Sequence, residues 1–115
     1  MTELPYNFHD AGLLDFAVGP RNEISLSLGL DNPNLPPHQL VFARLGGVAN
    51  LSEVVAFLAK IPPARTSDAY RARVDSFDYL TSERQKEGKL SLVLELGGLG
   101  KITVACRNIT FNLEE

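Results

Sequence analysis

The chain has 115 residues, of which 44% are hydrophobic and 22% are charged, and its formal net charge is -3. This composition excludes an intrinsically disordered chain, which combines low hydrophobicity with high net charge. The length fits a single domain that spans residues 1–115 and buries one hydrophobic core. The weakly acidic balance argues against nucleic acid as a partner, because proteins that bind nucleic acids usually carry a basic surface.

The chain contains one cysteine, Cys106, so no internal disulfide can form. Residues 1–10 lack the basic region and following apolar run of a secretory signal. No stretch approaches the roughly 20 apolar residues that a membrane helix requires. We therefore expect a cytoplasmic protein that does not contact membranes.

Residues 13–18 and 23–30 are the first predicted strands. In the second strand, isoleucine and leucine alternate with polar residues and glycine, a pattern typical of a sheet with one solvent-exposed face. The two strands are expected to form a hairpin through the turn at 19–22. A third strand is expected over 39–45, after a proline-containing loop at 31–37.

Residues 51–60 are the best candidate for a helix, and Pro62 and Pro63 would end it. Asn50 stands at the N-cap position, and Glu53 follows three residues later, as in a capping box. Ten residues cannot hold a helix alone in water, so this helix must pack on the sheet. The side chains expected on its buried face are Leu51, Val54, Val55 and Leu58.

Residues 69–81 fit either a helix or a strand. A strand would switch its apolar face between Val74 and Phe77, near Asp75 and Ser76. The aromatic and β-branched content of the segment favours the strand.

Residues 90–96 and 102–106 form the clearest pair of strands, since apolar side chains recur at every second position. The glycine-rich turn at 97–101 (GGLGK) lacks the leading glycine and the Ser or Thr of a phosphate-binding loop. After the second strand the apolar phase slips to Ile109 and Phe111, which predicts a β-bulge or a strand that crosses a corner. The expected cross-strand pairs are Leu96 with Ile102, Leu94 with Val104, and Leu92 with Cys106.

Short connections favour antiparallel pairing of consecutive strands, and the helix must bury its apolar face against the sheet. These elements predict an α+β fold. It would contain a twisted antiparallel sheet of about six strands and one main helix packed on one face, in the order βββαβββ.

No catalytic residue, cofactor or metal site is expected. His9 and Asp10 are the only adjacent histidine and acid, and they form a polar site that His38 could join. An imidazole oriented by a carboxylate can act as a base, so a small hydrolase or ligand-binding enzyme using His9 and Asp10 is an alternative function. The other interpretation of His9 is a buried or capping histidine at a strand entry. Cys106 lies in the apolar phase of its strand and is expected to be a buried, unreactive thiol.

The two changes of apolar phase suggest a binding surface. If residues 69–81 form a strand, its two aromatic residues point with two arginines, away from the core. Exposed apolar area beside arginine often marks an interface, so we expect a homo-oligomer or a complex with another protein. The alternative is a bend in which all four apolar side chains belong to the core. The candidate interface residues are Arg71, Arg73, Phe77, Tyr79, Ile109 and Phe111.

A further alternative assigns Arg65, Arg71 and Arg73 to the binding of an anionic ligand or nucleic acid. Residues 60–89 contain seven basic and five acidic residues, so the basic excess is small. A solvated surface of mixed charge explains the same segment.

Three segments carry a resemblance to a known group of proteins: residues 6–11 (YNFHDA), Phe42 with residues 47–51 (GVANL), and residues 102–111 (ITVACRNITF). They resemble small bacterial domains of unknown function that begin with a Phe-His-Asp-Ala motif, some of which are grouped with immunity proteins of polymorphic toxin systems. The resemblance implies non-catalytic binding of a toxin or another partner, and it assigns no functional residue. The function expected from the sequence is therefore a non-catalytic protein-interaction module.

Overall fold

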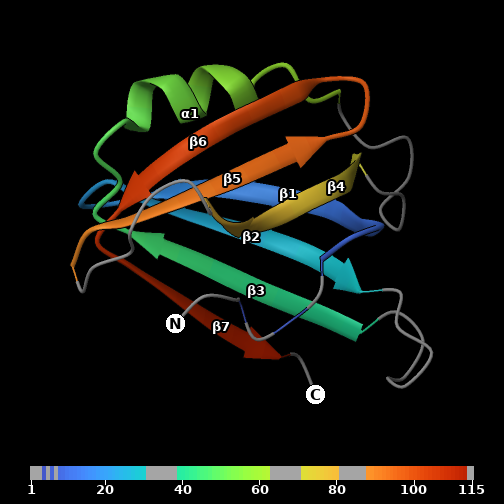
Figure 1. The fold of residues 1–115 in the computed structure, drawn as a ribbon, viewed down its shortest axis with the longest axis horizontal. Coiled ribbons are helices and arrows are strands. Elements are labelled where there is room, and N and C mark those ends of the chain that lie inside the picture. The colour runs from blue at the N-terminus through green and yellow to red at the C-terminus, as the bar shows by residue number, and fades with distance from the viewer. Residues whose placement is uncertain are drawn as a thin grey trace.

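The computed structural model describes residues 4, 6, 8–30, 39–62, 71–80 and 88–113. These residues form seven strands and one helix (Figure 1). The order along the chain is β1 (Ala11–Gly19), β2 (Glu23–Leu30), β3 (Gln39–Gly46), α1 (Leu51–Leu58), β4 (Ala72–Tyr79), β5 (Leu90–Leu96), β6 (Gly100–Cys106) and β7 (Asn108–Leu113). Within the described residues, no helix is long and apolar enough to cross a membrane.

The expected fold class is wrong. The described residues are mostly sheet with a single short helix, in the order βββαββββ, rather than an α+β fold with about six strands in the order βββαβββ. The last apolar run divides at Arg107, because its first half pairs with β5 and its second half pairs with β3. One expected strand is therefore two.

All seven strands pair antiparallel in the order β6-β5-β4-β1-β2-β3-β7. The two edge strands, β6 and β7, are consecutive in the chain and are separated by Arg107 alone. The sheet must therefore curl until its two edges meet at this corner, as Figure 1 shows. There the backbone N–H of Arg107 donates to the carbonyl oxygen of Gly46 at 2.9 Å. The prediction of a strand that crosses a corner is confirmed.

The hairpin of β1 and β2 and the strand within 69–81 are also confirmed. The predicted register of β5 against β6 is wrong by two residues. Gly98 and Gly100 both adopt positive φ, which tightens the turn so that β6 begins at Gly100. The observed pairs are Leu96 with Gly100, Leu94 with Ile102, Leu92 with Val104, and Leu90 with Cys106.

A β-bulge in β4 decides the direction of its aromatic side chains. Val74 pairs with Leu96 and Ser76 pairs with Glu95, so Asp75 is an extra residue on the β4 side. The bulge resets the alternation, and Phe77 and Tyr79 return to the buried face of Val74 with exposures of 3% and 6%. The expected switch of these two residues to the opposite face does not occur.

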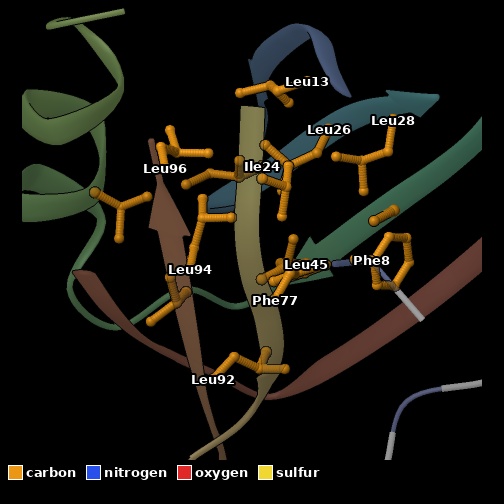
Figure 2. Close-up of a cluster of buried hydrophobic side chains, with 14 of the residues drawn as sticks. Phe8, Leu13, Ile24, Leu26, Leu28, Leu45, Phe77, Leu92, Leu94 and Leu96 are labelled. Carbon is orange, nitrogen blue, oxygen red and sulfur yellow. The ribbon is translucent and has the colours of Figure 1, made fainter. Parts of the chain in front are cut away.

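The core is one cluster enclosed by the curled sheet, to which β2, β4 and β5 contribute, as Figure 2 shows. The helix lies alongside β6 (Figure 1). It ends at Leu58 rather than at residue 60. Its buried side chains are Val54, Phe57 and Leu58, whereas Val55, expected on this face, is exposed.

Candidate functional site

The outer edge of β6 is closed by the residues that precede α1. Asn50 occupies the predicted N-cap position, but its side chain makes no hydrogen bond to the helix. Instead, its Nδ2 donates to the carbonyl oxygen of Thr103 at 2.7 Å, and its Oδ1 accepts from the backbone N–H of Ala105 at 3.0 Å. The N–H of Ala49 donates to the carbonyl oxygen of Ala105 at 2.7 Å. The side-chain amide thus takes the place of a neighbouring strand along this part of β6.

The outer edge of β7 is different. In the part of the chain that the structure describes, β7 pairs with β3 and with no other strand. Alternate residues of an edge strand point their N–H and C=O groups away from the one neighbouring strand. No described residue forms a backbone hydrogen bond with that side of β7. Among the described residues, nothing therefore occupies the outer side of this edge.

The side chains of β7 itself are uncharged and partly apolar. Asn108, Thr110 and Asn112 are exposed, and Leu113 is 45% exposed. Phe42 of β3, which pairs with Asn112, is 39% exposed. Along β7, outward-facing backbone N–H and C=O groups therefore lie close to exposed apolar side chains.

Of the six candidate interface residues, two lie in β7. Ile109 and Phe111 are half-buried, and the ring of Phe111 lies 5.7 Å from the rings of both Tyr6 and Phe8. Phe77 and Tyr79 are buried. Phe77 and Tyr79 therefore belong to the core, as the alternative interpretation expected. Ile109 and Phe111 are only partly buried against it.

The two arginines of that set lie in or beside β4, which β1, β2 and β3 separate from β7. Arg71 is largely buried and pairs with Asp15 at 3.1 Å, while its guanidinium carbon lies 4.8 Å from the ring centroid of Phe16. Arg73 pairs with Asp75 at 2.8 Å. The structure therefore does not bring the six candidates together, and Arg65 lies outside the described residues.

His9 and Asp10 lie at the β4 bulge. His9 Nδ1 is 2.9 Å from the carbonyl oxygen of Asp75, so this nitrogen must carry the hydrogen and donate it. His9 Nε2 is 3.5 Å from Asp10 Oδ2, and both side chains are more than half exposed. His9 is therefore not a buried histidine. His38, the third residue of the predicted polar site, lies outside the described residues.

A shallow hollow of about 210 Å³ adjoins His9. One of its carboxylates, Asp75, is paired with Arg73, and Asp78 accepts hydrogen bonds from the backbone N–H groups of Leu4 and Tyr79. Among the described residues, no group of three or more His, Cys, Asp or Glu is placed to hold a metal ion. The arrangement attaches the N-terminal segment to β4. The hollow is lined by Tyr6, Phe8, His9, Asp75, Ser76, Phe77 and Asp78.

Cys106 is buried, as expected, at the end of β6. Burial raises the pKa of its thiol from an ordinary value of 9.0 to about 11. The thiol is therefore protonated at neutral pH, and a protonated thiol is a poor nucleophile.

No family model, curated protein or solved structure matches the chain. Sequence reasoning missed the contact of Asn50 with β6 and the position of Thr110 and Asn112 on an edge strand. The sequence pattern around Asn50 predicted a helix cap. Its actual contact is with β6, which is more than 50 residues away in the sequence. For β7 a signal was present: polar, uncharged residues at 108, 110 and 112 alternate with apolar residues at 109 and 111.

Proposed function

We propose that this protein is a non-catalytic protein-interaction module that binds its partner through the outer edge of β7. The observation behind the proposal is the contrast between the two edges of the sheet. Asn50 and Ala49 close the edge of β6 between Thr103 and Ala105, whereas β7 has no strand on its outer side in the described chain.

Natural sheets usually protect their edges with charges, proline, bulges or a covering segment, because an open edge pairs with other chains. β7 has no charged residue and no proline, and its pairing with β3 is regular from Asn108 to Leu113. An extended segment of a partner can add to such an edge through backbone hydrogen bonds, while side chains beside the edge provide selectivity. Phe42 of β3 and Leu113 at the end of β7 are exposed and add apolar area near this edge.

The resemblance described above is to small bacterial domains of unknown function, some of which are grouped with immunity proteins of toxin systems. It makes a bacterial toxin one partner to test. The rival enzymatic function has less support, because His9 and Asp10 are both exposed beside a shallow hollow. Binding of an anion by Arg71 and Arg73 also has less support, since each arginine already has a carboxylate partner.

Site-specific photo-crosslinking tests the proposal. A photoreactive amino acid in place of Asn112 of β7 is expected to cross-link to a protein in cells that produce the chain. The matched control places the same group at Thr103, which is exposed on the closed edge strand β6, and cross-linking there should be weak. Equal cross-linking from both positions, or none from Asn112, would contradict binding at β7.

A further inference from the structure

The order of residues in β7 suggests what pairs with it. From Asn108 to Asn112 the residues are Asn, Ile, Thr, Phe and Asn. On each side of Thr110, the next residue is apolar and the one after it is an asparagine. An antiparallel copy of β7 therefore presents the same kind of side chain at every position, which is the self-complementarity that a two-fold symmetric contact requires.

We propose that β7 pairs antiparallel with β7 of a second copy of this chain, about a two-fold axis that passes through Thr110. This inference rests on the proposed use of the β7 edge and adds its partner. The two seven-stranded sheets would then continue into one another across the dimer.

The register follows from the symmetry. Thr110 lies opposite Thr110 of the second copy, and Asn108 lies opposite Asn112 at both ends. All of these side chains are on the exposed face of the strand. Threonine hydroxyls and asparagine amides both donate and accept hydrogen bonds, so like residues can pair directly.

On the other face, Ile109 of each copy lies opposite Phe111 of the other copy, so the pair occurs once on each side of the axis. Both side chains are half-buried in the single chain. A β-branched residue facing an aromatic residue is a favourable cross-strand pair, and the contact would bury the remaining area of both. The half-exposure of Ile109 and Phe111 is therefore expected of a core that continues across the dimer.

Charge does not oppose the contact. β7 contains no Lys, Arg, Asp or Glu, so no like charges face each other in this register. On β3, Arg44 is the residue opposite Thr110, and its side chain pairs with Glu23 at 3.1 Å. One strand pair is a small contact, so the dimer is expected to dissociate on dilution.

Sedimentation velocity of the purified full chain over a dilution series tests the proposal. The wild-type chain should pass from dimer to monomer as it is diluted. Thr110→Lys places two like charges on the axis and should raise the dissociation constant of the dimer by about tenfold or more. Thr103→Lys, the same change on the closed edge, should leave the dissociation constant unchanged. Circular dichroism verifies that both variants are folded.

Residues on a two-fold axis meet themselves, which allows a second test. Thr110→Glu should also weaken the dimer, and an equimolar mixture of Thr110→Lys and Thr110→Glu should restore it. A dimer that neither charge weakens, or that the mixture fails to restore, would overturn the proposed axis. A wild-type chain that is monomeric at every concentration, yet cross-links from Asn112 to a different protein, would overturn the second copy as partner. That result would leave binding at β7 standing.

Discussion

Asn50 connects the start of α1 to the outer edge of β6 through two side-chain hydrogen bonds. Both oxygen and nitrogen of the amide are used, one as acceptor and one as donor. The residue stands at the N-cap position just before α1, where asparagine commonly caps a helix, and yet its side chain is directed to the sheet. Together with the backbone N–H of Ala49, this side chain occupies the outer edge of β6 between Thr103 and Ala105.

Asn50→Asp distinguishes these two roles. Aspartate caps a helix about as well as asparagine, so a capping role predicts little change in stability. In the observed role, the new carboxylate oxygen faces the carbonyl oxygen of Thr103, and the free energy of unfolding should fall by about 1–3 kcal/mol. Urea denaturation measures this change. Asn112→Asp, the same change on an exposed side chain, should alter the stability of dilute protein by less than about 0.5 kcal/mol.

The Cys106 thiol makes stability depend on pH in a defined window. Its pKa is 9.0 when exposed and about 11 when buried in the folded chain, so the unfolded chain loses this proton first. The contribution to stability is complete below pH 9 and is lost as the pH rises toward 11. Burial also raises the pKa of Tyr79, which acts in the same direction.

Cys106→Val should therefore show a shallower fall in the free energy of unfolding between pH 9 and pH 11 than the wild-type chain. Part of the slope should remain because of Tyr79. An unchanged slope would mean that the thiol is not buried in the folded state. Denaturant titrations at several pH values provide the measurement.

At the scale of elements, the corner between β6 and β7 depends on a close approach to Gly47. Gly47 has a φ of 63°, and a Cβ atom there would lie 2.8 Å from the Cγ and Cδ atoms of Arg107. Gly98 in the β5–β6 turn also has a positive φ, of 79°, but has open space around it. A side chain at Gly98 would therefore cause backbone strain alone, whereas a side chain at Gly47 would cause backbone strain and a steric clash.

Gly98→Ala should lower the free energy of unfolding by roughly 1–2 kcal/mol, the usual cost of a left-handed residue with a side chain. Gly47→Ala should lower it further because of the contact with Arg107. Arg107→Ala removes the Cγ and Cδ atoms but keeps the Cβ, which would lie 3.1 Å from the new Cβ. It should therefore recover most of the additional loss, as a double-mutant cycle would show. Equal effects of the two alanine substitutions would contradict the close approach at this corner.

The sequence predicted most of these elements for a clear physical reason. Period-2 alternation identified β2, β5 and β6, because one face of each strand is buried. In β4 the break in alternation was visible, but its consequence was not. A bulge at Asp75 and a switch of faces produce the same order of apolar residues, and only the pairing of β4 with β5 decides between them.

At the scale of the whole molecule, the sequence could not show how the two halves of the sheet join. The pairing of β7 with β3 joins Phe111 to Ala43, and the hydrogen bonds of Asn50 to β6 span more than 50 residues. Local patterns carry no information on such distant contacts. The same limit explains the predicted interface, which combined residues of β4 and β7 that the sheet order separates.

In the described part of the chain, the central feature is a curled sheet with one closed edge and one open edge. Hydrogen exchange of individual backbone amides, followed by NMR at low and high protein concentration, tests it most directly. The amide of Ala105 should exchange slowly at both concentrations, because Asn50 accepts its hydrogen. In β7, alternate amides should exchange fast in dilute protein and slow down when the concentration is raised. Fast exchange at Ala105, or uniform protection of β7 in dilute protein, would contradict the closed edge at β6 and the open edge at β7.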